Sequence, residues 1–311
     1  MIVYGGDYEH TLEVSSSPHG VDLDYRVTSR PDLFAKVLKR QEFDACEFSL
    51  SNYIMLRDRG ADWLTAVPVF PNRAFRHGTI AVRRDSTICS FRDLVGRRVG
   101  ISDYTMTGGV WCRGIMLDQY GVHWSEMEWF SGETPRFPAP AAARVSPSAL
   151  DLEAALSDGA IDALFLPRNK DALLPVDQRR FRPLLADWRA AELDYFKTTQ
   201  IYPISHVIVI PRASVAKARR LPDAIYAAYS HSMQRAKARR LATSLLPWGA
   251  ASWDDAMQVF AGDPLPYGLT TANLKIIRKL QDYLVEQQLV ERQHDIADLF
   301  ERVDADADVA A

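Results

Sequence analysis

The chain has 311 residues, of which 47% are hydrophobic and 25% are charged. This length and composition are typical of a globular protein with enough apolar residues for two cores of ordinary size. The formal net charge is only −3, and acidic and basic residues are interspersed along the chain. We therefore expect no basic surface that would bind nucleic acid or an anionic membrane. A small-molecule partner is favoured instead.

The three cysteines, Cys46, Cys89 and Cys112, are an odd number and form no CxxC pair. This pattern argues against a disulfide framework and against a structural zinc site, so we expect a reducing compartment. The first residues, MIVYGGDYEH, lack a basic segment followed by an apolar core. No later stretch approaches the roughly 20 apolar residues of a membrane span. We therefore expect a cytoplasmic protein.

Short apolar runs alternate with amphipathic helical patterns, which predicts an α/β fold. In the first part of the chain, strands are expected at 2–4, 21–27, 43–47 and 65–70, and helices at 32–40 and from Ser49 or Ser51 to Gly60. Either serine can begin that helix, because its hydroxyl can accept a hydrogen bond from a backbone N–H of the first turn. Further along, strands are expected at 98–102, 128–130, 163–166 and 183–185, and helices at 107–120 and 148–158.

Three other parts of the chain have a predicted character of their own. The Pro/Ala-rich segment 134–148 predicts a surface loop. The chain beyond residue 214 is expected to be mostly helical, and the tail DADADVAA at 304–311 is expected to be disordered. No repeat of solenoid period is found.

Two stretches, GTIAVRRDS at 78–86 and SHVIVIPRAS at 205–214, look alike, because each is a β-branched run ended by basic or polar residues. Two similar strands that bracket a central α/β segment predict a chain that leaves one lobe, builds a second lobe and returns. We expect residues 1–80 and 206–311 to form lobe 1 and residues 85–203 to form lobe 2. The two crossover strands should lie side by side at a hinge, and domain closure there would trap a ligand in a polar cleft.

The densest polar and aromatic cluster is VFPNRAFRHG, which places Arg73, Arg76 and His77 directly after a predicted buried strand. Loops at strand ends line the clefts of α/β proteins, and guanidinium groups bind carboxylates through paired hydrogen bonds. The cluster therefore predicts an anion-binding corner. The alternative is that both arginines are solvated and that the histidine is packed in a turn.

A second candidate is DYTMTGGVWCRG, in which Tyr104, Thr105 and Thr107 precede or open a helix that carries Arg113. Small residues and backbone N–H groups at a helix start can seat a carboxylate. The glycines match neither the dinucleotide-binding nor the Walker pattern, so a nucleotide site is not predicted. The alternative is an ordinary helix cap with glycine in the turn.

A third candidate is EFSLSNY, in which Glu47 precedes the hydroxyls of Ser49 and Ser51. Glu47 is either a cleft acid or an electrostatic cap of the following helix. His206 opens the return strand and can exchange a proton near neutral pH, or it is a structural histidine. Convergence of Glu47, His77 and His206 on a metal stays open, although no HExxH or comparable spacing supports it.

Taken together, these segments resemble the 4,5-dihydroxyphthalate decarboxylase family, cytoplasmic relatives of periplasmic binding proteins. The combination of VFP-x-R-x-FRH, YxMTxxVWxRG and DPxPYG carries most of the resemblance. Gly108 and Gly109 stand where the family commonly has alanine, which marks a place where the pocket can differ. The matching stretches run in order over nearly the whole chain: GGDYEHT, EFDACEFSLSNY, VFPNRAFRHG, GRRVGISDYTMTGGVWCRGIMLDQYGV, GAIDALFLPR, YPISHVIVI, LPWG and DPLPYGL.

The resemblance implies a two-lobed, type II periplasmic-binding-protein-like α/β fold and an enzyme, a carboxy-lyase. The implied reaction is non-oxidative decarboxylation of a hydroxylated aromatic dicarboxylic acid such as 4,5-dihydroxyphthalate. It can proceed by protonation of the ring carbon that bears the carboxylate, followed by loss of CO2. No metal and no organic cofactor are expected, and no nucleic acid or membrane partner. Homo-oligomer formation stays open.

Roles for the candidate residues follow as hypotheses. His77 is the first choice as the acid, His206 is the second acid or the group that polarises the phenol, and Glu47 is a further candidate. The alternatives are a cytoplasmic solute-binding-like protein and another lyase of the same fold that acts on an aromatic or chorismate-like carboxylate. The carboxylates would be bound by Arg73, Arg76, Arg113 and Arg168, with hydrogen bonds from Ser49, Ser51, Tyr104, Thr105 and Thr107.

Overall fold

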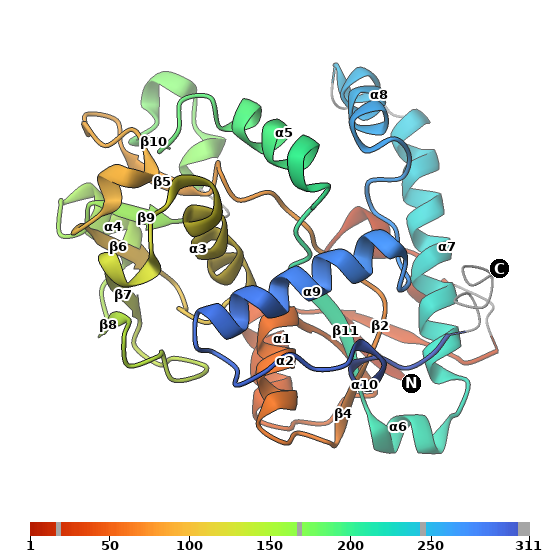
Figure 1. Cartoon of the computed structure of the whole chain (residues 1–311). Helices are drawn as coiled ribbons and strands as arrows, with labels where there is room; N and C mark the ends of the chain where they lie inside the picture. The colour runs from red at the N-terminus through yellow and green to blue at the C-terminus, as the bar shows by residue number, and fades with distance from the viewer. Residues whose placement is uncertain (17–19, 167–169, 243–246, 304–311) are drawn as a thin grey trace. The chain divides into compact units, whose positions relative to one another are not determined.

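The computed structural model describes residues 1–16, 20–166, 170–242 and 247–303 (Figure 1). The chain divides into two compact units, each built on one mixed β-sheet with helices, so the predicted α/β class is confirmed. Unit 1 comprises Met1–Arg73, Ile204–Ile277 and His294–Ala311, and unit 2 comprises Ala74–Pro203 and Arg278–Gln293.

These boundaries differ from the expected lobes in two places. The chain first leaves unit 1 after Arg73, ahead of the strand that was expected to make the crossing. Residues Arg278–Gln293 belong to unit 2, because helix α9 (Thr271–Glu286) begins in unit 1 and continues in unit 2. Helical periodicity shows which face of a helix is buried, but it does not show which neighbour buries it.

The sheet of unit 1 has the order β2-β1-β3-β11-β4. Strand β11 runs antiparallel to both of its neighbours, whereas β1 pairs with β2 and β3 in parallel. Every residue of β3 is buried, as expected for a central strand covered on both faces. The strands are β1 (Ile2–Gly5), β2 (Asp24–Val27), β3 (Ala45–Ser49), β4 (Leu64–Val67) and β11 (His206–Pro211).

Helices α1 and α2 of unit 1 each begin at a serine cap. Ser29 caps α1 by accepting a hydrogen bond from Asp32 N, and Ser49 caps α2 by accepting one from Asn52 N. Of the two serines considered for α2, Ser49 is therefore the N-cap. No helix among the described residues is long and apolar enough to cross a membrane. The helices are α1 (Arg30–Leu38), α2 (Leu50–Asp58), α6 (Arg212–Lys217), α7 (Leu221–Ala242), α8 (Gly249–Phe260) and α10 (Ile296–Leu299).

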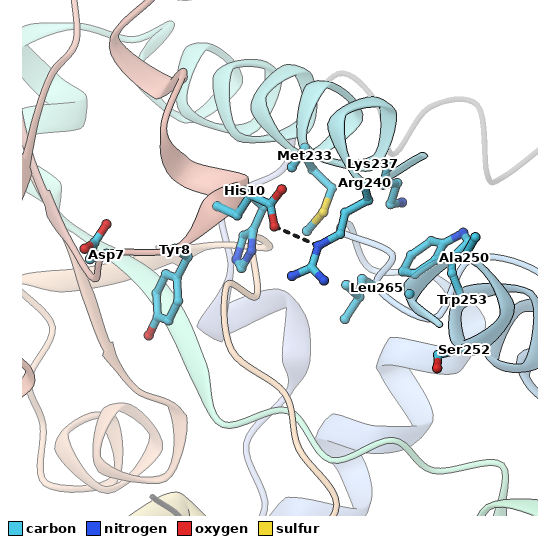
Figure 2. A pocket seen from close by; sticks show the side chains of 13 residues that line it. Asp7, Tyr8, His10, Met233, Lys237, Arg240, Ala250, Ser252, Trp253 and Leu265 are labelled. Carbon is cyan, nitrogen blue, oxygen red and sulfur yellow. Dashed lines mark hydrogen bonds and ion pairs between the residues drawn. The ribbon is translucent and has the colours of Figure 1, made fainter. Parts of the chain in front are cut away.

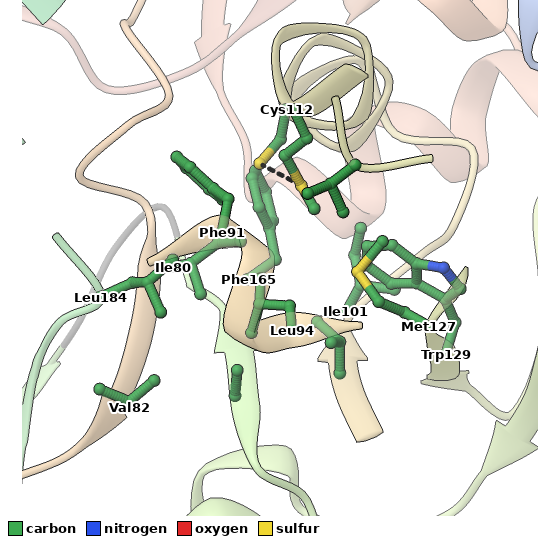
Figure 3. Packing of buried hydrophobic residues seen from close by; sticks show 14 of the residues in the cluster. Ile80, Val82, Phe91, Leu94, Ile101, Cys112, Met127, Trp129, Phe165 and Leu184 are labelled. Carbon is green, nitrogen blue, oxygen red and sulfur yellow. Dashed lines mark hydrogen bonds between the residues drawn. The ribbon is translucent and has the colours of Figure 1, made fainter. Parts of the chain in front are cut away.

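The sheet of unit 2 has the order β10-β5-β9-β6-β7-β8, and its two faces are covered by different helices. Ile80 and Val82 of β5 pack in one cluster with Cys112 of α3, as Figure 3 shows. Ala81, which points to the opposite face, packs with Leu156 of α4. The elements are β5 (Ile80–Arg83), β6 (Arg98–Ile101), α3 (Thr107–Tyr120), β7 (Glu128–Gly132), β8 (Arg144–Ser148), α4 (Leu152–Ser157), β9 (Ala163–Phe165), β10 (Phe181–Pro183) and α5 (Trp188–Thr199).

The two similar strands, β5 and β11, belong to different sheets and do not pair with each other. Each runs antiparallel to its neighbours in its own sheet, so the likeness in sequence reflects the same place in two sheets. The segments that pair are the connections beside the unit boundary. Arg73 and Ile204 form an isolated antiparallel bridge in unit 1, and Ala74 N donates to Pro203 O at 3.1 Å in unit 2.

The segment 134–148, predicted as a surface loop, ends in a strand. Strand β8 pairs in parallel with β7 and forms an edge of the unit 2 sheet. It contains Pro147, which lacks a backbone N–H and is therefore tolerated at an edge but not in the middle of a sheet. Because an edge strand tolerates proline, its Pro/Ala-rich sequence looked like that of a loop. The tail 304–311 lies outside the described residues.

Gly114→Ala should destabilise unit 2. Gly114 of α3 packs directly against the ring of Tyr283, and an added methyl group would overlap three ring atoms. Overpacking of this kind costs about 1–3 kcal/mol, so the midpoint of thermal unfolding followed by circular dichroism should fall. Tyr283→Leu removes the ring, so the double variant should lose less stability than the sum of the two single changes. Equal melting of wild type and Gly114→Ala would contradict this packing.

Candidate functional site

A buried glutamate–histidine pair lies where β3 ends and β11 begins in unit 1. His206 is the first residue of β11 and is paired with Ser49, so Glu47 is its diagonal neighbour on the same face of the sheet. Nδ1 of His206 lies 2.5 Å from Oε1 of Glu47. The Glu47 side chain is 1% exposed and that of His206 is 11% exposed. The register of the sheet therefore brings two residues far apart in sequence into direct contact.

The carboxylate of Glu47 is held by donors from the first strand as well. Gly6 N donates to Oε2 at 2.8 Å, and the Tyr8 hydroxyl donates to Oε1 at 2.8 Å. Burial acts to raise the pKa of Glu47, but the hydrogen bond and charge of His206, with Gly6 and Tyr8, outweigh it and hold this pKa below its usual value. Glu47 is therefore ionised at neutral pH. A carboxylate on Nδ1 orients an imidazole and stabilises its protonated form, which can then release a proton from Nε2.

Tyr8 reaches Glu47 because of the glycine before it. A Cβ atom at Gly6 would lie 2.6 Å from Cε2 of Tyr8, so glycine allows the ring to fold back over the loop. Burial and the negative charge of Glu47 raise the pKa of Tyr8 to about 12, so its hydroxyl stays protonated and donates. The ring stacks on His10, with centroids 5.1 Å apart and planes at 11°. The stretch GGDYEHT thus forms a loop that both supports Glu47 and presents His10.

A cavity of about 570 Å³ opens beside this loop, within unit 1. It is enclosed by residues 7–10, by α7 and α8, and by Leu265. Figure 2 shows His10, Met233, Leu265 and Trp253 around the same space. A cavity of this volume is large enough for one substituted aromatic ring. Tyr8 also lines it, so one side chain connects the cavity to the Glu47–His206 pair.

The other predicted site residues of unit 1 are Ser49, Ser51 and Arg73. Ser49 and Ser51 are buried, and their hydroxyl oxygens are 3.2 Å apart at the start of α2. Arg73 is 9% exposed and donates to Pro266 O and to Asn273 Oδ1, both at 2.7 Å. Arg73 therefore fastens the loop before α9 in addition to any contact with a ligand.

In unit 2, Arg76 lies against the first turn of α3. A Cβ atom at Gly108 would be 3.3 Å from Cζ and Nη1 of Arg76, so glycine here, where the family commonly has alanine, gives the guanidinium room. The N-cap residue Met106 provides no side-chain cap for this helix, and Thr107 is its first residue. Thr105 donates its hydroxyl to Asp103 at 2.7 Å in the preceding turn. A guanidinium beside a helix N-terminus is a setting that favours an anion.

His77, the first choice for the acid, is enclosed in unit 2. It is 0% exposed, its Nε2 lies 2.7 Å from Gln119 Oε1, and its ring contacts those of Phe91, Tyr120 and Tyr195. Burial lowers the pKa of His77 in spite of the hydrogen bond to Gln119, so the imidazole is neutral at neutral pH. These are the surroundings of a packing residue, which was the alternative that the sequence left open.

Arg113 and Tyr104 are also interior residues of unit 2, at 0% and 1% exposure. Arg113 donates to Gln287 Oε1 and to the Tyr104 carbonyl, both at 2.9 Å, and its guanidinium lies 3.8 Å from the centre of the Tyr104 ring. Burial lowers the pKa of Arg113. We therefore interpret Arg113 as holding α3 to the turn before it and to the residue that follows α9, while the predicted carboxylate contacts stay a prediction. Arg168 lies outside the described residues.

Three functional candidates were missed by sequence reasoning. Tyr8 and His10 lie in a stretch that carried the family resemblance but received no role; the available signal was their position directly after a strand. Glu192 on α5 accepts a hydrogen bond from Gly78 N at 3.2 Å, and burial raises the pKa of Glu192 to about 7. Its helix gives no pattern that would distinguish it from a solvated residue. Among the described residues, no three His, Cys, Asp or Glu side chains gather as a metal site.

Comparison with known proteins identifies the family of this chain. The model of the family described as "ABC transporter, phosphonate, periplasmic substrate-binding protein" matches residues 9–246. The chain belongs to this family. The periplasmic aliphatic sulphonate binding protein SsuA of Escherichia coli aligns with 97% of this chain and 91% of its own at 17% identity, with a TM-score of 0.60. The desulfurization enzyme DSZB aligns with 95% of this chain and 94% of its own at 17% identity, with a TM-score of 0.54. The predicted periplasmic-binding-protein-like fold is confirmed.

Two curated relatives of this chain are named 4,5-dihydroxyphthalate decarboxylase. The one from Comamonas testosteroni is 29% identical over 263 residues, which cover 80% of this chain and 79% of the relative. The one from Pseudomonas putida is 35% identical over 159 residues, which cover 48% of this chain and 62% of the relative. The resemblance to that family, first seen in the sequence stretches, is confirmed.

Glu47→Gln should destabilise unit 1, because it keeps the shape of the side chain but removes the charge that faces His206. Breaking a buried ion pair costs about 3–5 kcal/mol. Since the folded pKa of Glu47 is below its ordinary value of about 4.3, its contribution is present above that value and is lost as the pH falls through the folded pKa. The difference in melting midpoint between wild type and variant should be large near neutral pH and should shrink below about pH 4.

Tyr8→Phe is the matched control for this prediction. It removes a hydrogen bond from an uncharged donor to the same carboxylate, so the loss should be closer to about 1–2 kcal/mol. Melting of Glu47→Gln at the wild-type temperature near neutral pH would show that the Glu47–His206 pair does not contribute to stability.

Proposed function

We propose that this protein is a carboxy-lyase that removes CO2 from a hydroxylated aromatic dicarboxylic acid such as 4,5-dihydroxyphthalate. The names of the two curated relatives supply the reaction class. The observation on this chain that carries the proposal is the contact of 2.5 Å between Glu47 and His206. It is a buried proton-transfer pair, linked through Tyr8 to a cavity large enough for one ring.

In this mechanism His206 is the acid. Its protonated form, stabilised by Glu47, gives a proton to the ring carbon that bears the carboxylate, and a ring π pair forms the new C–H bond. The C–C bond to the carboxylate then breaks, its electron pair restores the aromatic ring, and CO2 leaves. His206 takes a proton from solvent, so each turnover consumes one proton.

The assignment of the acid differs from the first hypothesis, which favoured His77. A proton donor must be charged or readily charged near neutral pH and must reach the substrate. His206 faces a carboxylate, whereas His77 faces a neutral amide and three aromatic rings. A carboxylate neighbour favours the imidazolium and an apolar enclosure disfavours it, so the two environments separate the roles.

Within unit 2, we propose that Arg76 and the first turn of α3 form an anion-binding site. The guanidinium and the backbone N–H groups of a helix start both favour a carboxylate. Thr107 lies in that turn, and Thr105 shapes the one before it through Asp103. Ser49, opposite His206 in the strand register, and Ser51 are proposed to provide hydrogen bonds in unit 1.

The assay that tests the proposed function is incubation of the purified protein with 4,5-dihydroxyphthalate, with CO2 and 3,4-dihydroxybenzoate measured together. We expect stoichiometric release of both, unchanged after treatment with a chelator. Binding with recovery of intact ligand would favour a solute-binding protein and contradict the proposal. Turnover of a different acid from a panel of aromatic and chorismate-like carboxylates, without CO2 release, would indicate another lyase.

Arg76→Leu should lower kcat/KM by at least tenfold, which corresponds to about 1.4 kcal/mol of lost binding in the transition state. The melting temperature should change little if the guanidinium serves the ligand. Arg92→Leu, an exposed arginine of the same unit, is the control and should behave like wild type in both measurements. If Arg76→Leu melts much earlier than wild type and the folded fraction keeps normal kinetics, Arg76 is a structural residue.

A further inference from the structure

His10 lines the cavity, and a hydrogen bond to the backbone determines which of its ring nitrogens carries the hydrogen. Its Nε2 lies 2.9 Å from the carbonyl oxygen of Pro71, and a carbonyl can only accept, so Nε2 carries the hydrogen. In the neutral imidazole the lone pair is therefore on Nδ1. No described residue hydrogen-bonds to Nδ1, and His10 is among the residues that line the cavity. The stack on Tyr8 holds the ring in this orientation.

Apart from the exposed Asp7, the charged groups around His10 are paired with one another or with neighbouring residues. On its own loop, Glu9 accepts from Arg240 of α7 at 2.7 Å, and Asp7 is exposed. Lys237, also on α7, is paired with Asp263 at 2.7 Å, and Glu47 of β3 is bound to His206. Burial lowers the pKa of His10, although the Pro71 carbonyl and Glu47 act in the opposite direction. His10 is therefore neutral at neutral pH, with a basic nitrogen.

The rest of the cavity suits an aromatic ring. Met233, Trp253 and Leu265 supply apolar and aromatic surface from two helices and a loop, as Figure 2 shows. A thioether and an indole are both good partners for a ring face or edge. A basic nitrogen to which no described residue donates favours a ligand that can donate a hydrogen bond to it. A phenolic hydroxyl is such a donor.

Resting on the proposed decarboxylation, we propose that this cavity binds the hydroxylated end of the substrate ring and that His10 is the base for the hydroxyl para to the departing carboxylate. Nδ1 takes the phenolic proton while His206 protonates the ring carbon, so the intermediate is a neutral dienone and not a ring cation. When the C–C bond breaks and CO2 leaves, the electron pair restores the ring as a phenolate. The His10 imidazolium then returns its proton to the phenolate oxygen.

Tyr8 is the positioning residue that joins the two histidines. Its ring stacks on His10, and its hydroxyl binds the same carboxylate oxygen of Glu47 that faces His206. The acid and the base are thus both linked to Tyr8, and the roles proposed for them require a hydroxyl para to the departing carboxylate. With 4-hydroxyphthalate, the carboxylate para to the hydroxyl should leave, giving 3-hydroxybenzoate; 4-hydroxybenzoate as the main product would contradict the role of His10.

The kinetic test is His10→Gln, which keeps a donor for Pro71 but cannot accept a proton. We expect kcat to fall by about 10²-fold with a smaller change in KM. Because burial lowers the pKa of His10, the wild-type rate should decline only at a pH below the ordinary histidine value of about 6.5, where His10 becomes protonated. That decline should be weaker in His10→Gln. His231→Gln on α7, whose histidine is half-exposed beside Glu13, is the control and should match wild type. Wild-type kcat and pH profile in His10→Gln would overturn the inference.

A second test does not depend on turnover. The probe is 4-nitrocatechol, whose visible absorption changes when its hydroxyl loses a proton. Bound to wild type at a pH where the free probe is protonated, it should show the phenolate spectrum; His10→Gln and His10→Phe should lose this shift, and His231→Gln should keep it. The same bound spectrum in all four proteins would overturn the role of His10. If wild type releases no CO2 from 4,5-dihydroxyphthalate, the proposed function fails, while the probe spectra still decide whether His10 takes up a phenolic proton.

Discussion

The negative charge of Glu47 is buried, and most of the site is arranged around that fact. A buried carboxylate costs several kcal/mol unless hydrogen bonds and an opposite charge replace the lost water. Gly6 and Tyr8 come from the loop after β1, and His206 comes from the start of β11, so the ends of neighbouring strands must meet at one edge of the sheet. The same demand explains the glycine at position 6, because a side chain there would displace the Tyr8 ring.

The two units use one structural plan for different purposes. Each has a mixed sheet covered on both faces, in which one strand, β5 or β11, runs antiparallel to both neighbours. In unit 1 that strand brings a histidine to a carboxylate, and in unit 2 the corresponding histidine, His77, is packed among aromatic rings. The anion-favouring feature of unit 2 is instead the start of α3 beside Arg76. Anion binding and proton transfer are thus assigned to different secondary-structure elements.

Local features of the fold were predictable from the sequence where a single helix or strand determines them. The helix at 107–120 has the predicted bounds, and Ser49 is a cap because hydroxyl capping is a local interaction. Which strands pair and which elements a helix packs against could not be predicted from the sequence. Strand β8 was concealed by Pro147, and α9 buries one part of its length in each unit, although its periodicity is continuous.

The contacts that define the site could not be predicted from the local sequence either. His77 and His206 stand beside similar strands, and nothing local distinguishes them. The difference arises from residues distant in sequence, Gln119 for one and Glu47 for the other. Both histidines were candidates for the acid from the sequence alone, and their long-range contacts distinguish them. His10 was missed because a loop has no periodicity, and its role depends on the carbonyl that fixes its tautomer.

The central claim is that His206, held by Glu47, delivers the proton to the ring. The most direct measurement is the single-turnover rate of CO2 release from 4,5-dihydroxyphthalate by wild type, His206→Asn and His77→Gln, each corrected for its folded fraction. We expect His206→Asn to slow this step by about 10²–10⁴-fold, because the acid is lost while binding survives, and His77→Gln to stay near wild type. A large loss in His77→Gln together with a normal rate in His206→Asn would contradict it.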